Sequence, residues 1–269
     1  MTQCIAYHHD QTLSYGDYGN PDGYPILVQH GLIASIKDAA LFQRLLGQGT
    51  RVICIARPGY GASSPYEMKD VAEWGSIVAA LVDALQLSQF DVFGISSGAP
   101  YSYAIGYRLP EKTRHIYILS GTPALFDERV LAHWPYPISK DAKIPEMQQL
   151  AKDLFFSDLS EADLRSDDVR DSMMNDCFGI AQDFRIRCRD WGFDLSEVKP
   201  PVWMRHSRAD SSVPLATAEI TARLLANCRL EIRENDPHFS NAVVDDFIQT
   251  TILERLACRD QTLDRRVYE

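Results

Sequence analysis

Short apolar runs bounded by turn-forming residues recur along the first half of the chain. They occupy residues 25–29, 51–56, 90–95 and 115–120. Runs of this length that end near Gly or Pro fit strands buried on both faces of a parallel sheet. Two further strand-like stretches, at residues 4–7 and 13–18, open the chain.

Stretches with a helical spacing of apolar residues separate these runs. Between residues 71 and 85, apolar residues recur at intervals of three and four, which predicts an amphipathic helix. Residues 99–108 predict another helix, which ends before Pro110. Because strands and helices alternate, we predict an α/β fold built on a mostly parallel, doubly wound sheet.

The alternation stops after the strand expected at residues 115–120. From residue 125 to 198, large apolar side chains are scattered through charged sequence without a convincing buried strand. Because loops of that length rarely lack structure of their own, we predict a helical cap inserted after the sixth strand. The pattern then resumes with expected strands at residues 202–206 and 230–233 and expected helices at residues 217–225 and 243–256. The predicted domains are a core of residues 1–124 and 199–269 and a cap of residues 125–198, with a frayed end at residues 259–269.

The composition is that of a globular protein, and the charge argues against nucleic acid as a partner. Of the 269 residues, 45% are hydrophobic and 24% charged, and the net charge is −10. No apolar stretch approaches the roughly 20 residues of a membrane helix, and the first residues lack the features of a signal peptide. The six cysteines form no Cys-x-x-Cys motif, so we expect no metal site. We therefore expect a cytoplasmic protein without a membrane or nucleic-acid partner.

The strongest candidate for chemistry is the sequence Gly-Ile-Ser-Ser-Gly at residues 94–98. It directly follows an apolar strand and directly precedes a helix, which is the context of a nucleophile elbow that exposes a serine hydroxyl. The alternative is that Ser96 is an ordinary turn serine. As a nucleophile, Ser96 would have beside it the backbone N–H of Ser97, at a helix N-terminus, where it can stabilise an oxyanion.

A serine hydroxyl needs a base that takes its proton and an acid that orients the base. His238 follows the last predicted strand, and Asp210 follows the strand before it. The order Ser96, Asp210, His238 is the chain order of the triad on one particular fold. Asp127 is an alternative acid and His206 a rival base. The competing interpretations of Asp210 and His238 are a surface loop residue and a structural histidine.

Several motifs in this order resemble the α/β-hydrolase fold superfamily, and within it the cap-bearing serine hydrolases that need no cofactor. The matching pieces are His-Gly at residues 30–31, Arg-Pro-Gly-Tyr-Gly at residues 57–61, the Ser96 elbow, Trp-Gly-Phe-Asp-Leu-Ser at residues 191–196, and the loops of Asp210 and His238. The resemblance spans residues 25–247. It implies an α/β-hydrolase fold, no metal or organic cofactor, and a second oxyanion N–H from Leu32. His30 is expected to shape that turn.

Details of these motifs narrow the subfamily only in part. Position 96 is Ser, where haloalkane dehalogenases and epoxide hydrolases of this fold carry Asp. The His-Gly pair continues with Leu32-Ile33 instead of the further glycines of lipase-like members. Ser97 stands where prolyl iminopeptidases usually have Trp and where many perhydrolases and carbon–carbon hydrolases have Met. The subfamily therefore stays open.

Aromatic residues of the predicted cap are candidates for an apolar acyl pocket. We predict His133, Trp134 and Phe178 as substrate-binding residues, and the alternative is that such residues form the packing core of the cap. Three arginines at alternate positions within residues 185–189 could bind a carboxylate, but a solvated helix face is the preferred interpretation.

The expected activity is hydrolysis of a small, fairly apolar carboxylic ester, thioester or amide through an acyl-enzyme, with a small-molecule acyl substrate as partner. Two alternative classes remain. The first keeps the triad for carbon–carbon bond hydrolysis, peroxide-dependent acyl transfer or a lyase reaction. The second is a non-catalytic ligand receptor on the same fold, because a fold alone does not decide function. The sequence indicates no oligomeric state.

Overall fold

A single sheet of eight strands organises the molecule, in a computed structural model that describes residues 2–8 and 10–257. The strands are β1 (Thr2–Tyr7), β2 (Gln11–Gly19), β3 (Pro25–Gln29), β4 (Arg51–Ile55), β5 (Phe90–Ile95), β6 (Thr113–Leu119), β7 (Val202–Ser207) and β8 (Cys228–Arg233). Their order across the sheet is β1-β2-β4-β3-β5-β6-β7-β8. The β1–β2 and β2–β4 pairs are antiparallel and the other pairs of this sheet are parallel. The predicted mostly parallel α/β sheet is confirmed.

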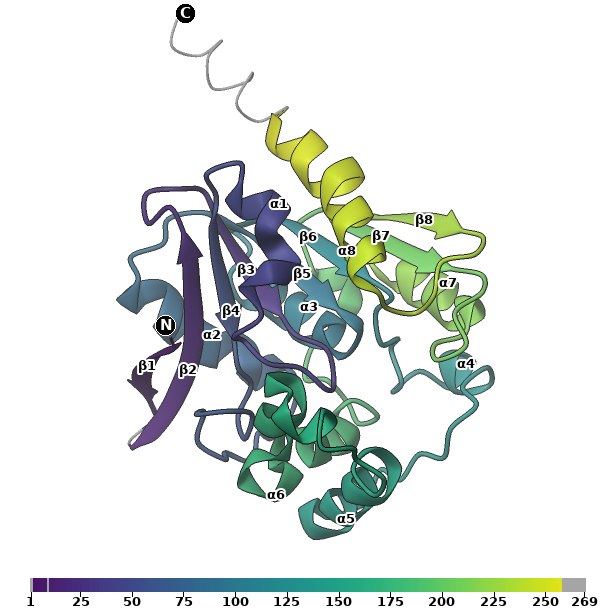
Figure 1. Cartoon of the computed structure of the whole chain (residues 1–269). Helices are drawn as coiled ribbons and strands as arrows, with labels where there is room; N and C mark the ends of the chain where they lie inside the picture. Colours follow the sequence, from purple (N-terminus) through teal and green to yellow (C-terminus); the bar gives the residue numbers. More distant parts are fainter. Residues whose placement is uncertain (1, 9, 258–269) are drawn as a thin grey trace, which may run out of the picture.

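Helices cover both faces of the sheet (Figure 1), as a doubly wound fold requires. One face carries α2 (Ala72–Ala84), α3 (Ala99–Arg108) and α7 (Leu215–Leu224), and the other carries η1 (Ala39–Phe42), α1 (Gln43–Leu46), α8 (Asn241–Phe247) and the π-helical continuation η5 (Ile248–Ile252). The expected helices at residues 71–85, 99–108, 217–225 and 243–256 are all present. The short helices at residues 39–46 were not predicted.

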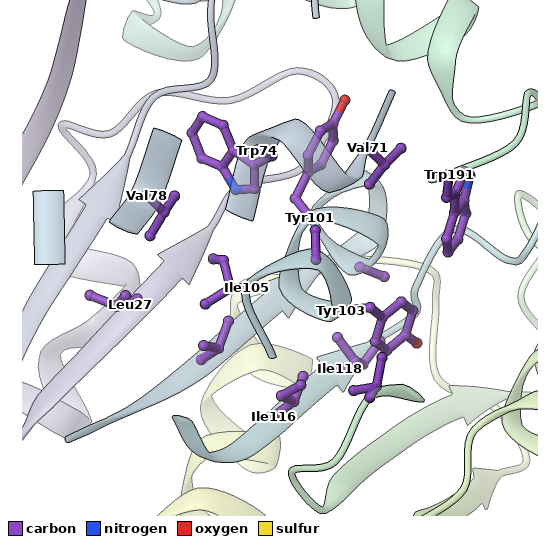
Figure 2. Packing of buried hydrophobic residues seen from close by; sticks show 14 of the residues in the cluster. Leu27, Val71, Trp74, Val78, Tyr101, Tyr103, Ile105, Ile116, Ile118 and Trp191 are labelled. Atoms are coloured by element: carbon purple, nitrogen blue, oxygen red, sulfur yellow. The ribbon is translucent and has the colours of Figure 1, made fainter. Parts of the chain in front are cut away.

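The parallel strands contribute side chains to two separate hydrophobic cores. Along β6, Ile116 and Ile118 pack against the α2–α3 face, whereas Tyr117 and Leu119 pack against the α1–α8 face. Figure 2 shows the first of these cores, where the two β6 isoleucines lie beneath Ile105 of α3. Because successive strand side chains point to opposite faces, a run that is apolar throughout must be covered on both sides.

A helical segment follows the sixth strand, as expected. Residues 125–198, here called the helical insertion, are all described and contain no strand. The insertion contains α4 (Glu128–Leu131), α5 (Ile144–Phe155), η3 (Asp163–Arg165), α6 (Asp167–Ile186) and η4 (Leu195–Glu197). α5 and α6 pack against each other at one end of the molecule (Figure 1), while Leu125 and Trp191 near its two ends belong to the α2–α3 core. Its status as a separate domain stays a prediction.

α6 is interrupted in its middle. Asn175, Asp176 and Cys177 have φ values of 51°, 60° and 62°, so three consecutive residues with side chains adopt the left-handed conformation. Tertiary contacts accompany the break: Asn175 Nδ2 donates to Gly59 O (3.1 Å), and Lys152 of α5 pairs with Asp176 (2.6 Å). The break therefore lies where the insertion meets both the core and α5.

Two remaining expectations concern the whole chain. Within residues 2–8 and 10–257, no helix has both the length and the apolar character needed to cross a membrane. The charged end expected to fray, residues 259–269, lies outside the described residues.

Candidate active site

Ser96 lies in a sharp turn between β5 and α3. Its φ is 50°, an uncommon backbone conformation for a residue with a side chain. Flanking glycines make the turn possible. A Cβ on Gly94 would lie 2.3 Å from Ser102 Oγ, and a Cβ on Gly98 would lie 2.1 Å from the backbone oxygen of residue 29. The strand–turn–helix context predicted for Ser96 is therefore present, and strained residues of this kind cluster at functional sites.

Ser96 is linked by hydrogen-bonding distances to two residues from distant loops. Its Oγ lies 2.9 Å from Nε2 of His238, which follows β8. His238 Nδ1 lies 2.8 Å from Oδ2 of Asp210, which follows β7. The Asp210 side chain is fully buried, and that of His238 is 20% exposed. The fold thus brings the three predicted residues together in the arrangement of a nucleophile, a base and an orienting acid.

The Asp210 carboxylate is fixed by its own loop. Its Oδ1 accepts the backbone N–H groups of Ser212 (2.9 Å) and Val213 (2.8 Å), which leaves Oδ2 to face His238. Burial raises the pKa of the Asp210 carboxyl, but the hydrogen bonds from His238 and Val213 outweigh this effect and hold the pKa below its usual value. Asp210 is therefore ionised at neutral pH, and its Oδ2 can accept a hydrogen bond from the N–H of His238 Nδ1.

The alternative acid and the rival base are occupied elsewhere. Asp127 caps the N-terminus of α4, where it accepts the N–H of Arg129 and pairs with its guanidinium at 2.6 Å. His206 is buried, and its Nε2 lies 2.8 Å from Val213 O and 3.4 Å from Asp210 Oδ2. Burial lowers the pKa of His206, so this ring stays neutral beside the carboxylate. The acid that faces His238 is therefore Asp210.

His30 holds the turn that lies beside Ser96. Its Nδ1 lies 2.8 Å from Gly31 O, and its Nε2 accepts the N–H of Arg57 (3.3 Å). Burial and the Arg57 charge keep the pKa of His30 well below its usual range, so it is neutral and structural. A Cβ on Gly31 would lie only 3.9 Å from Ser96 Cβ. Gly31 therefore lies beside the serine, and the oxyanion roles of the next residue, Leu32, and of Ser97 stay predictions.

A cavity of about 810 Å³ opens onto this arrangement. Ser96, Ser97, His238 and Leu32 form part of its wall. Both the core and the helical insertion contribute apolar lining residues: Val28, Leu41, Phe42 and Val213 from the core and Trp134, Met147, Leu150, Phe155 and Phe184 from the insertion. This volume is in the range of small-molecule sites. Among the described residues, no group of three or more His, Cys, Asp or Glu side chains is arranged to hold a metal ion.

Of the three predicted substrate-binding residues, the structure places one in the cavity wall. Trp134 lines the cavity, whereas His133 and Phe178 are not part of the lining. His133 is exposed at the surface. Phe178 packs on the turn at Gly59, where a Cβ would meet its ring at 2.5 Å. The structure does not bring His133 and Phe178 to this cavity, because the insertion turns one side chain to solvent and the other to the core, and substrate binding by the three residues stays a prediction.

A buried ion pair that the sequence did not reveal joins the helical insertion to the core. Arg57 donates to both carboxylate oxygens of Asp183 (3.2 and 2.7 Å), and the two side chains are 1% and 3% exposed. Tyr60 and Tyr101 donate to the same carboxylate at 2.9 and 2.5 Å. Arg57 also donates to the backbone oxygens of residues 30–31, beside Ser96. The sequence signal that could have revealed Asp183 is its position as an acid among the apolar residues of its helix.

The three arginines at alternate positions have three different environments. Arg185 pairs with Glu67 at 2.9 Å. Arg189 Nε donates to Lys140 O (2.7 Å). Arg187, the C-cap residue directly after α6, lines the cavity. They do not share one solvated helix face, because α6 ends among them and alternate positions of a helix point in different directions.

Comparisons with known proteins agree with this architecture. The model of the Alpha/beta hydrolase family matches residues 26–248. The uncharacterized hydrolase YcgS of Bacillus subtilis is 29% identical over 136 residues, which are 51% of this chain and only 44% of that relative's length. A non-heme chloroperoxidase of Streptomyces lividans is 27% identical over 245 residues, covering 83% of this chain and 88% of that protein.

Solved structures share the fold at lower sequence identity. An esterase from Exiguobacterium antarcticum aligns with a TM-score of 0.68 and 20% identity and covers 100% of both chains. A hydrolase from Pseudomonas aeruginosa aligns with a TM-score of 0.70 and 18% identity, over 95% of this chain and 98% of that one. These likenesses extend over the sheet and the insertion together. With a family model that matches most of its length, this chain belongs to the alpha/beta hydrolase family.

Proposed function

We propose that the chain is a serine hydrolase that cleaves a small, fairly apolar carboxylic ester, or a related thioester or amide, through an acyl-enzyme. The observation that carries the proposal is the relay from Ser96 Oγ through His238 to Asp210, at 2.9 and 2.8 Å, in the wall of a largely apolar cavity. A buried carboxylate, a histidine and a strained serine have no need to meet at a cavity for stability alone.

Each residue has one role in the proposed reaction. Asp210 holds the proton of His238 on Nδ1, so that Nε2 can accept the hydroxyl proton of Ser96 as Oγ attacks the carbonyl carbon. The backbone N–H groups of Leu32 and Ser97 stabilise the oxyanion that develops. His238 then protonates the leaving group, which departs and leaves an acyl group on Oγ. A water molecule deprotonated by His238 finally attacks the acyl-enzyme and releases the carboxylic acid.

Peroxide-dependent acyl transfer is the second candidate, because one relative is named a non-heme chloroperoxidase. In this reaction hydrogen peroxide replaces water in the attack on the acyl-enzyme, and a peroxy acid leaves in place of the acid. Carbon–carbon bond hydrolysis would use the same three residues, and a ligand receptor would use only the cavity. A gain of oxidising product when acetate and hydrogen peroxide are supplied together would favour acyl transfer to peroxide over simple hydrolysis.

The first test is the intact mass of the protein after exposure to a fluorophosphonate. We expect one stoichiometric adduct on the wild type and none on Ser96→Ala, because only a serine activated by a base reacts. Ser139→Ala is the matched control, since Ser139 also lines the cavity but belongs to the helical insertion, whereas the relay residues belong to the core. This variant should be labelled like the wild type. A well-folded wild type that takes no adduct would favour the receptor instead.

A further inference from the structure

Arg187 presents a positive charge to the cavity. Its guanidinium carbon lies 4.6 Å from the ring centre of Phe184 and 6.0 Å from that of Trp134, and all three residues line the cavity. Within the part of the chain that the structure describes, no carboxylate pairs with this guanidinium and no oxygen accepts a hydrogen bond from it. Its five N–H donors are therefore available to a bound molecule.

The nearest acid on the same helix cannot neutralise Arg187. Asp183 lies one turn earlier, but its two carboxylate oxygens already accept four hydrogen bonds, from Arg57, Tyr60 and Tyr101. Arg57 and Arg187 thus bring two positive charges to a region with one buried carboxylate. Burial lowers the pKa of Arg187, and the charge of Asp183 only partly opposes this effect. Arg187 is half-buried in this wall, and a partly desolvated cation without a charged partner favours a bound anion as its counter-ion.

The opposite charge gathers elsewhere on the cavity wall. Asp38 and Asp168 also line the cavity, and Asp168 accepts the backbone N–H of Ser35 at 2.7 Å. Asp168 lies near the start of α6 and Arg187 at its end, so the two charges come from opposite ends of this helix. Burial raises the pKa of the Asp168 carboxyl, and neighbouring carboxylates add to the effect. An anion that enters the cavity is therefore attracted to the wall at Arg187, away from the wall that carries Asp38 and Asp168.

We propose that Arg187 binds a carboxylate of the substrate, so that the ester cleaved at Ser96 carries a free acid group on its acyl or leaving part. Cleavage of this ester rests on the proposed esterase function, whereas binding of the carboxylate at Arg187 does not depend on it. A guanidinium offers two parallel N–H groups that match a carboxylate. A phosphate dianion would need a second cation, and none of the described residues lining the cavity is another Lys or Arg. The aromatic faces of Trp134 and Phe184 exclude water from the ion pair, which strengthens it.

The test compares two esters of equal length, the 4-nitrophenyl monoester of glutaric acid and 4-nitrophenyl pentanoate. They differ in a terminal carboxylate against a terminal methyl group. We expect the wild type to favour the acidic ester in kcat/KM. Arg187→Gln should lower the ratio of acidic to neutral kcat/KM on the order of 10- to 100-fold, mainly through KM of the acidic ester. Arg187→Lys keeps the positive charge but loses the two parallel N–H groups, so it should lower the ratio less than Arg187→Gln does.

The matched control is Arg189→Gln, which removes the same charge two residues away, where the side chain bonds Lys140 O outside this cavity. Its ratio should equal that of the wild type. A ratio that is unchanged in Arg187→Gln, or an equal fall for both esters in this variant, would overturn the proposal and leave Arg187 as a packing residue. Thermal unfolding of each variant shows whether a loss reflects folding, and Arg187→Lys decides if Arg187→Gln does not fold.

A binding measurement separates this proposal from the hydrolase proposal. Calorimetry with Ser96→Ala compares monomethyl glutarate with dimethyl glutarate, before and after the additional change Arg187→Gln. Preference for the monoanion that disappears with Arg187 supports the anion site even if the wild type takes no fluorophosphonate. Equal binding of both compounds overturns the anion site even if Ser96 reacts, and the hydrolase proposal then stands alone.

Discussion

At the scale of single residues, the tautomer of His238 depends on how Asp210 is held. The backbone N–H groups of Ser212 and Val213 both donate to Oδ1, so only an acceptor can occupy that position. Oδ2 faces His238 Nδ1 at 2.8 Å and fixes the proton there. The free electron pair of Nε2 then points at Ser96. In the proposed mechanism, the loop geometry around Asp210 thus decides whether His238 can act as the base.

We expect Asp210→Asn to lower kcat on a reactive ester by about 10⁴-fold. The new carboxamide must keep its oxygen toward the N–H groups of residues 212–213, so its NH₂ faces His238 Nδ1. This arrangement favours the tautomer with the proton on Nε2, which cannot accept a proton from Ser96. Asp127→Asn removes the same charge from the other candidate acid and should keep wild-type kcat. A loss of less than tenfold in Asp210→Asn would argue against the assigned role.

At the scale of elements, the turn between β5 and α3 is packed directly onto β3. Gly98 is the point of closest approach, since a Cβ there would lie 2.1 Å from the backbone oxygen of Gln29. The backbone of a central strand cannot move aside without disturbing its pairing with β4 and β5. The first residue of α3 is Ala99, so the same contact sets where this helix begins relative to the sheet.

Gly98→Ala should lower the free energy of unfolding by roughly 3 kcal/mol, because overpacking of this kind commonly costs about 1–3 kcal/mol and the contact is with backbone. Gly47→Ala is the control. Gly47 has a helical φ of −64°, and its nearest neighbour to an added Cβ is 3.3 Å away. That change should stay within about 1 kcal/mol of the wild type. Urea unfolding measures both, and equal stabilities would show that the turn can relax.

At the scale of the whole molecule, buried neutral histidines couple stability to pH. Burial lowers the pKa of both His30 and His206 from 6.5 in the folded state. The unfolded chain therefore binds more protons than the folded chain once the pH falls below about 6.5, and protonation pulls the equilibrium toward unfolding. Stability contributed by these rings is complete above that pH and declines as the pH falls.

We expect the free energy of unfolding to fall between pH 7.5 and 5.5, with each buried histidine adding a slope that approaches about 1.4 kcal/mol per pH unit below its unfolded pKa. His206→Gln should make the slope shallower by one such contribution, since glutamine can still donate to Val213 O and does not titrate. The measurement is urea unfolding at a series of pH values. An identical slope in this variant would mean that His206 takes up no proton on unfolding.

The sequence predicted the parts of the molecule that depend on local pattern. Each buried strand is a short apolar run, and the candidate triad follows from residues that come after the ends of β5, β7 and β8. For the helical insertion, the sequence predicted the bounds and the helical character but not the individual helices. Its α6 breaks at residues 174–177 through contacts with Gly59 and α5, and no local signal marks such a break. Likewise, the three arginines at alternate positions have different environments. Arg187 lines the cavity, Arg185 pairs with Glu67, and Arg189 donates to Lys140 O. Tertiary packing decides these environments, and the spacing alone does not.

The ion pair between Arg57 and Asp183 limits how this protein can be re-engineered or can diverge. Segments that cover an active site are attractive units for exchange between homologues, because they carry substrate preference. Here the core supplies Arg57, Tyr60 and Tyr101, and the insertion supplies the single carboxylate that satisfies them all. A transplanted insertion without an acid at that position would leave a guanidinium buried against two hydroxyls, a defect that costs about 3–5 kcal/mol. An insertion from a homologue is therefore compatible with this core only if it carries an acid at the position of Asp183, or if Arg57 is replaced at the same time.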